Sequence, residues 1–139
     1  MARNPELRLP PRDGPQTGLL LLIILSFLTG CAATITRDTL LKQMQVGAQP
    51  LIVDVRSRGE YERDRIPGAI HIPFYSVRSG LEELQFPKDK TLVLYCEHGP
   101  RAGISGFLLY LTGYEQLYSL EGHMKGWREN HFPVELPAP

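Results

Sequence analysis

Residues 91–101 read TLVLYCEHGPR, and this stretch decides the expected fold. Its first half, Thr91–Tyr95, is apolar without polar alternation, which is typical of a strand buried on both faces of a parallel sheet. Its second half, Cys96–Arg101, is a short loop that leads into an expected helix from about Ala102. In open α/β sheets, ligands bind outside the carboxyl ends of the strands. The stretch therefore predicts an α/β protein whose site lies in the loop that contains Cys96.

The rest of the chain repeats this alternation of apolar runs and helix-like patterns. The expected strands are residues 51–55, 69–72, 91–95 and, as the weakest pattern, 116–120. The expected helices are residues 36–47, 76–84, 102–111 and 123–129. Strands that alternate with helices in a short chain favour one open α/β sheet with helices on both faces.

Composition narrows the class of protein. A length of 139 residues suits one hydrophobic core and not two. The 15 Lys and Arg residues balance the 15 Asp and Glu residues, so no basic field indicates nucleic acid as a partner. Two cysteines, Cys31 and Cys96, are too few for a disulfide scaffold and lack zinc-finger spacing. Each cysteine therefore needs its own explanation.

The first thirty residues are typical of an export signal rather than of a folded domain. Arg3, Arg8 and Arg12 precede the unbroken apolar run Leu19–Leu28. This run is shorter than the roughly 18 to 20 residues that a membrane-spanning helix needs. We therefore expect residues 1–30 to form a cleaved signal peptide.

The residues that close this segment, Leu28-Thr29-Gly30-Cys31, resemble the lipobox of bacterial lipoproteins. The resemblance implies cleavage before Cys31, lipidation of its thiol and a mature domain of residues 31–139. More than one acyl chain on one residue gives stable anchoring. We therefore expect a protein of the bacterial cell envelope that is lipid-anchored and faces the periplasm. An ordinary signal cleaved near Ala32 and an uncleaved anchor are the alternatives.

The loop after residues 91–95 carries the candidate chemistry. Gly99 reaches backbone angles closed to other residues and Pro100 fixes another, which allows successive N–H groups to point at one centre. Such a nest at a helix N-terminus binds anions and favours a nucleophilic thiolate at Cys96. Arg101 adds a forked donor for an oxyanion, whereas the carboxylate of Glu97 opposes a thiolate. Cys96 is therefore a candidate nucleophile, and the alternative is an inert buried thiol.

Five separated motifs, taken in chain order, resemble the rhodanese family. They are Asp54-Val55-Arg56, Glu60-Tyr61, Ile66–Pro73, Cys96–Arg101, and Leu120-Glu121-Gly122 with Gly126-Trp127. The resemblance covers about residues 35–135 and implies a single-domain rhodanese with a five-stranded, mainly parallel sheet. It implies a sulfurtransferase in which Cys96 takes sulfane sulfur from thiosulfate or a persulfide donor. Cys96 then holds the sulfur as a persulfide and passes it to a thiol or to cyanide.

The resemblance also assigns roles to individual residues. Cys96 is the implied catalytic residue, and the implied substrate-binding residues are Glu97, His98, Gly99, Pro100 and Arg101. Asp54 and Arg56 are implied to form a structural ion pair beside the loop. We expect His71 to support the loop rather than act as a base, and Trp127 to pack in the core. Neither a cofactor nor a metal is expected, because Cys96, His98 and His123 match no usual zinc spacing.

Three departures from the family pattern bear on substrate choice. Asp64-Arg65 stands where the family often has Gly-His, and Ala102 stands where it often has a hydroxyl residue. Gly122-His123 stands where the family usually has Gly-Gly, and the change would bring an extra imidazole near the loop mouth.

Two other functions compete with sulfur transfer. Related phosphatases and arsenate reductases have five residues between the cysteine and the arginine, whereas four residues separate Cys96 from Arg101. A non-catalytic, membrane-tethered docking module is the other alternative, and the intact Cys96 argues against it. The expected partners are therefore a small sulfur donor, a thiol acceptor and, through the lipid on Cys31, a membrane.

Overall fold

Five parallel strands form one sheet in the order β1-β5-β4-β2-β3 in a computed structural model that describes residues 32–137. The strands are β1 (Ala33–Ile35), β2 (Leu51–Asp54), β3 (Ile70–His71), β4 (Leu92–Tyr95) and β5 (Leu117–Leu120). Every strand pairing is parallel. The predicted α/β fold with a five-stranded sheet is therefore confirmed. The expected signal segment, residues 1–30, and Cys31 lie outside the described residues.

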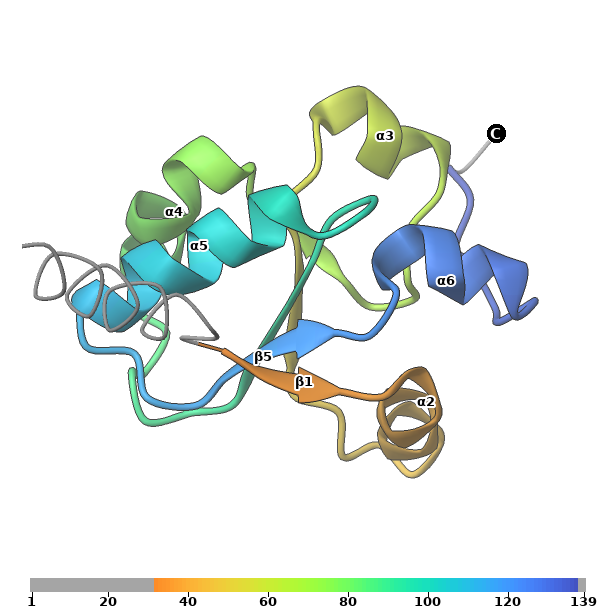
Figure 1. Ribbon diagram of the computed structural model, residues 1–139, viewed down its shortest axis with the longest axis horizontal. Helices are drawn as coiled ribbons and strands as arrows, with labels where there is room; N and C mark the ends of the chain where they lie inside the picture. The colour runs from red at the N-terminus through yellow and green to blue at the C-terminus, as the bar shows by residue number, and fades with distance from the viewer. Residues whose placement is uncertain (1–31, 138–139) are drawn as a thin grey trace, which may run out of the picture.

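Helices cover both faces of this sheet (Figure 1). They are α2 (Arg37–Gln45), α3 (Arg58–Arg63), α4 (Val77–Glu83), α5 (Pro100–Leu111) and α6 (His123–Glu129), with a short 3-10 turn, η1 (Phe74–Ser76), before α4. Leu94 packs into one core with α4 and α5, whereas Val93 packs into a second core with α2 and α6. Because successive strand residues point to opposite faces, burial of both faces explains why β4 lacks polar alternation.

Several elements differ from the sequence-based expectation, β1 and the start of α5 among them. β1 has no separate signal in the residue pattern, because it is a three-residue edge strand with two exposed residues that is held by pairing with β5. The helix expected from Ala102 begins at Pro100 instead. Proline suits the first turn of a helix because its fixed φ is helical and its missing N–H would have no partner there.

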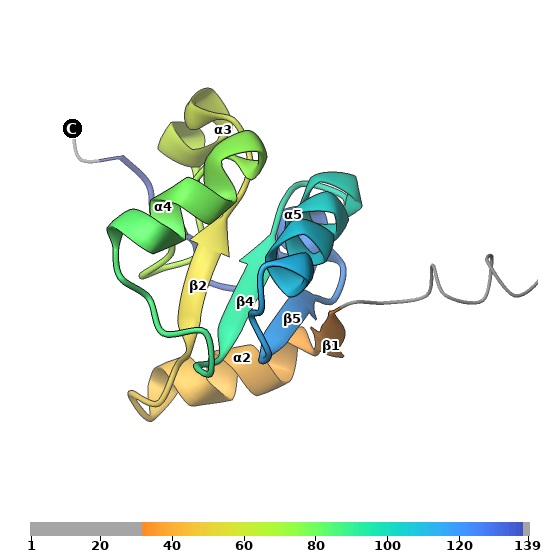
Figure 2. The ribbon, with the colours of Figure 1, turned by 90° about the vertical axis from the view of Figure 1, so that its left-hand side faces the viewer.

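The carboxyl ends of the strands meet at one end of the molecule. Figure 2 shows the arrowheads of β2 and β4 pointing towards the end where α3 lies. Asp54 and Tyr95, the last residues of these two strands, are direct partners in the sheet register. The segments that follow, which contain Arg56 and Cys96, therefore leave the sheet side by side. Within residues 32–137, no helix is long and apolar enough to cross a membrane.

Candidate active site

The loop after β4 curls around the sulfur of Cys96. The Gly99 N–H donates a hydrogen bond to Cys96 Sγ at 3.0 Å. Gly99 caps α5 with a φ of 126°, a conformation that side chains other than glycine rarely adopt. Cys96 is only 1% exposed. The thiol therefore sits on the floor of a short loop, in contact with a backbone donor at the start of a twelve-residue helix.

Beneath the loop, a fully buried arginine organises the site. The Nε and Nη2 atoms of Arg56 donate to the Asp54 carboxylate at 2.7 to 3.0 Å, and Nη1 donates to Asp64 at 3.2 Å. Burial by itself lowers the pKa of Arg56, but the hydrogen bond and charge of Asp54 outweigh it, and the net pKa is raised. The expected ion pair of Asp54 with Arg56 is present, and the departure at Asp64 supplies a further acceptor for the same guanidinium.

The loop residue Glu97 is held by two guanidinium groups. Its Oε2 accepts a hydrogen bond from Arg56 Nη1 at 3.3 Å, and its Oε1 accepts one from Arg128 Nη2 on α6. Arg128 also donates to Asp64 at 3.1 Å. Both oxygens of Glu97 are thus engaged, so the negative charge next to Cys96 is compensated. A substrate contact by Glu97 stays a prediction.

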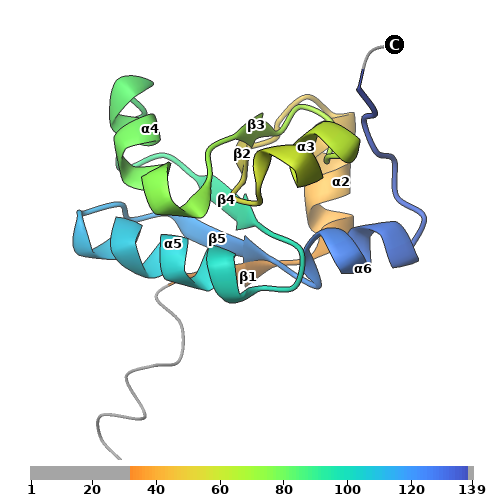
Figure 3. The ribbon, with the colours of Figure 1, turned by 90° about the horizontal axis from the view of Figure 1, so that it is seen from above.

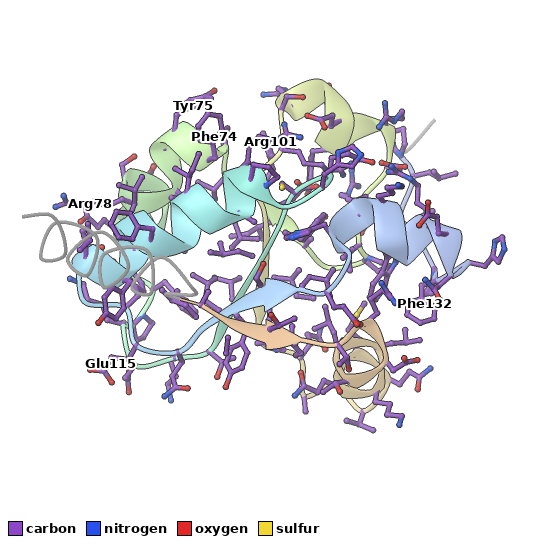
Figure 4. The ribbon with its side chains drawn as sticks, viewed as in Figure 1. Phe74, Tyr75, Arg78, Arg101, Glu115 and Phe132 are labelled. Carbon is purple, nitrogen blue, oxygen red and sulfur yellow. The ribbon has the colours of Figure 1, made fainter. Side chains whose placement is uncertain are left out.

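Arg101 pairs with α3. Its Nη1 and Nη2 donate to the two carboxylate oxygens of Glu60 at 2.7 and 2.8 Å. This hydrogen bond is the main cause that lowers the pKa of Glu60 well below its usual range. The pKa of Arg101 is raised, first by Glu60 and to a smaller extent by the Cys96 sulfur. Figure 4 shows Arg101 at the end of α5 that lies nearest α3. The fork expected to bind an oxyanion is therefore occupied by Glu60.

The histidines named from the sequence take different positions. His71 Nε2 lies 2.9 Å from the carbonyl oxygen of Arg56, and its ring stacks on Tyr61 with centroids 4.9 Å apart. This position suits a residue that supports the turn after β2. His98 is exposed on the loop itself. Trp127 is fully buried, as expected for a core residue.

His123 contacts the loop at two residues, Cys96 and Gly99. Its Nδ1 accepts a hydrogen bond from the Cys96 N–H at 3.4 Å. A Cβ added to Gly99 would lie 3.1 Å from His123 Nε2, so the imidazole packs directly on that glycine. Burial lowers the pKa of His123, and the charge of His98 lowers it further. The neutral imidazole is therefore the form that fits against the loop.

Three residues near the loop have roles that sequence reasoning missed or left general: Glu60, Arg128 and His123. Glu60 forms a capping box with Ser57. Its carboxylate accepts a hydrogen bond from the Ser57 N–H at 3.0 Å. The Ser-x-x-Glu spacing is a sequence signal for such a box, although it does not reveal the contact with Arg101. Arg128 carries no local signal, because its partner Glu97 lies 31 residues earlier in the chain.

Within residues 32–137, the cavities away from the loop contain no cysteine. Among residues 32–137, no group of three His, Cys, Asp or Glu residues is placed to hold a metal ion. A cavity of about 710 Å³ lies between α2 and the opposite end of the sheet, and it is lined by no cysteine, histidine or carboxylate. The Cys96 loop is therefore the candidate active site.

Comparison with known proteins identifies the family. Residues 36–130 match the family described as Rhodanese-like domain, and the chain belongs to that family. It is 28% identical over 94 residues to the thiosulfate sulfurtransferase GlpE of Glaesserella parasuis, covering 68% of this chain and 85% of that protein. It is 30% identical over 87 residues to a sulfurtransferase of Allochromatium vinosum, covering 63% of this chain and 79% of that protein.

A solved structure from Rhodopseudomonas palustris shares the fold. This protein, RPA3614, is described as of unknown function and a possible tyrosine phosphatase. It superimposes with a TM-score of 0.67 at 22% identity, covering 92% of this chain and all of that one. At this identity the likeness shows the fold alone.

Replacing Arg56 tests the buried ion network. We expect Arg56→Met to lower the free energy of unfolding by about 3 to 5 kcal/mol, because it leaves the buried Asp54 carboxylate without its partner. Arg58→Met is the matched control, since Arg58 is 83% exposed and pairs with Glu62 on the surface of α3. The control should cost less than about 1 kcal/mol. Urea unfolding measures both, and equal losses would contradict the network.

Replacing His123 tests its buried, neutral state. Because the folded state lowers the pKa of His123 below its ordinary 6.5, the unfolded chain binds the proton more readily. The contribution of His123 to the free energy of unfolding is therefore full above pH 6.5 and declines as the pH falls below that value. We expect the unfolding free energy of the parent to drop more than that of His123→Gly between about pH 7.5 and about pH 5.5.

The matched control for this experiment is His131→Gly. His131 has a φ of 55°, close to the 52° of His123, but it is exposed. Glycine relieves the same backbone strain at both positions. The control should keep the pH dependence of the parent's unfolding free energy. If His123→Gly kept the same pH dependence, the assignment of a buried, neutral His123 would be refuted.

Proposed function

We propose that this protein is a sulfurtransferase that carries sulfane sulfur as a persulfide on Cys96. The observation that carries the proposal is the hydrogen bond from the Gly99 N–H to Cys96 Sγ at 3.0 Å, in the short loop between β4 and α5. Membership of the rhodanese-like family and the sulfurtransferases among its relatives support this reaction. Thiosulfate or a small persulfide is the proposed donor.

The cycle has two nucleophilic displacements. The Cys96 thiolate attacks the outer sulfur of thiosulfate, a new S–S bond forms, and sulfite leaves with the electron pair of the broken S–S bond. A thiol or cyanide acceptor then attacks the outer sulfur of the persulfide. The bond between Cys96 Sγ and the outer sulfur breaks, and the Cys96 thiolate leaves with its electron pair and is ready for the next donor. No cofactor takes part, because the sulfur moves only between nucleophiles.

The Gly99 N–H and the N-terminus of α5 supply positive potential at the sulfur, in addition to Arg101. Arg101 is paired with Glu60, and Glu97 is paired with Arg56 and Arg128, so these side chains largely neutralise one another. The loop N–H groups and the N-terminus of α5 keep their dipoles directed at the loop, where they favour a thiolate, a persulfide and an anionic donor. His98, Gly99 and Pro100 are the residues we assign to contact the donor, and contacts by Glu97 and Arg101, whose charged groups are paired, stay predictions.

Phosphatase chemistry is the weaker alternative. A tetrahedral oxyanion needs a wider loop, whereas here four residues separate Cys96 from Arg101. In addition, the Arg101 fork that would bind such an anion is occupied by Glu60. A non-catalytic docking module would not need the contact between the Gly99 N–H and the Cys96 sulfur.

We also propose that the domain works at a membrane. The lipobox-like residues before Cys31 support cleavage after residue 30 and acylation of Cys31. The mature protein, residues 31–139, would then be anchored in the cell envelope and face the periplasm. Removing residues 1–30 leaves 12 basic and 13 acidic side chains, so the acyl chains rather than surface charge would supply the membrane affinity.

Replacing Cys96 tests the chemistry. We expect the intact mass of the purified protein to rise by one sulfur atom after thiosulfate and to return to its starting value after cyanide. Cys96→Ser should show neither change and should keep the thermal unfolding of the parent, because serine has a similar size. A mass gain that persists in Cys96→Ser would place the sulfur elsewhere. If the folded parent gained no mass with thiosulfate or with persulfide donors, the phosphatase and the docking-module alternatives would be favoured.

Replacing Cys31 tests the anchor. We expect the full-length protein, expressed in a Gram-negative host, to fractionate with membranes and to carry acyl chains in its intact mass. Cys31→Ser should lose the acyl mass and retain residues 1–30, because the cysteine of the lipobox-like sequence is gone. Its thiosulfate reaction should stay at the level of the parent, because Cys31 has no part in the proposed cycle. An unacylated parent that stays in the soluble fraction would refute the anchor.

A further inference from the structure

The outer face of α5 is apolar and exposed. The helix packs on the sheet through one face, which contains Ala102, Ser105, Gly106 and Leu109. The opposite face follows the i, i+3, i+4, i+7 spacing with Ile104, Phe107, Leu108 and Leu111, which are between 43% and 63% exposed. No residue from 102 to 114 is charged. A helix that is apolar on both sides is typical of one that is covered on both sides.

The described chain begins against this same helix. A Cβ added to Gly106 would lie 3.4 Å from the Cβ of Ala32, so Ala32 packs directly on α5. Gly106 lies on the buried, sheet-facing side of the helix, together with Ala102, Ser105 and Leu109. Figure 3 shows α5 at an outer edge of the fold with β1 beside it. The chain therefore enters the domain beside α5, next to its sheet-facing side.

The predicted anchor leaves no linker at this point. Cys31 directly precedes Ala32, and neighbouring Cα atoms are about 3.8 Å apart. A lipid on Cys31 would hold α5 close to the bilayer. An extended linker would let the domain tumble, whereas this short connection limits which surface meets the lipid.

We propose that the exposed face of α5 lies on the lipid bilayer, with Ile104, Phe107, Leu108 and Leu111 at the boundary between headgroups and acyl chains. This inference rests on the proposed acylation of Cys31. Burial of an uncharged, apolar helix face in the interface adds affinity without desolvation of a charge. Because α5 starts in the Cys96 loop and spans about 18 Å at 1.5 Å per residue, docking also keeps the active site within a helix length of the membrane surface.

Fluorescence quenching by brominated lipid tests the orientation. The full-length protein is expressed in a Gram-negative host and reconstituted in vesicles of phosphatidylethanolamine and phosphatidylglycerol that contain dibromo-phosphatidylcholine. One variant is Phe107→Trp, which replaces one exposed aromatic residue by another. The control is Val46→Trp, since Val46 is 76% exposed at the end of α2, on the opposite side of the sheet. The native Trp127 is buried and provides a constant background.

We expect the added tryptophan at position 107 to lose about half of its fluorescence in brominated vesicles, while that at position 46 stays unquenched. Leu111→Trp should behave like Phe107→Trp, and it serves if the first variant unfolds. Equal quenching at positions 46 and 107 in vesicle-bound protein would overturn the proposal. So would an unquenched position 107 in acylated, vesicle-bound protein.

Two other occupants of the face give their own results, and either would overturn the proposal. Association of two copies would shield position 107 from iodide in vesicle-free detergent solution and double the mass as the concentration rises. An uncleaved segment 19–28 folded over α5 would give the same shielding, but in a monomer whose mass retains residues 1–30. If the protein is unacylated and does not bind vesicles, the proposed anchor itself fails. The thiosulfate reaction on Cys96, measured in the same sample, stays independent of all these results.

Discussion

The structure of the site depends on one buried charge, the Arg56 guanidinium. It is fully buried just after β2, where it forms ion pairs with Asp54, two residues earlier, and with Asp64, the residue after α3. A charge in this position is tolerated only with partners, because an unpaired buried ion costs several kcal/mol. Since Arg56 also binds Glu97, the same requirement fixes the loop that follows β4. The scaffold and the active-site loop are thus held by one group.

This arrangement resolves a conflict next to the reactive thiol. A carboxylate beside Cys96 would disfavour a thiolate, yet both oxygens of Glu97 are bound by arginines, one just after β2 and one on α6. Arg101 interacts with the sulfur and would favour a thiolate, but its charge is shared with Glu60. The Gly99 N–H and the N-terminus of α5 add fixed dipoles at the sulfur. Such dipoles are fixed by the fold and need no side-chain rearrangement when an anion arrives.

The two faces of α5 have different surroundings. Its inner face joins the core that contains Cys96, while its outer face is apolar and exposed. His123 closes the loop from the other side, with its Nδ1 on the Cys96 N–H and its ring against Gly99. A histidine in this position needs a φ of 52°, which costs backbone strain that glycine would avoid. The imidazole is thus held against the loop at the cost of this backbone strain.

The sequence by itself determined the α/β class, the central strands and the loop around Cys96. These follow from local patterns: apolar runs and a Gly-Pro pair after a strand. The pairing of Asp54 with Arg56 and the fifth strand came from family resemblance, and β1 is short with two of its three residues exposed. Only the tertiary structure decided that Glu60 binds Arg101 and that Glu97 binds Arg128, since these partners lie 41 and 31 residues apart in the chain. It also decided which side of α5 stays uncovered, because an apolar helix sequence does not say which of its faces the sheet will bury.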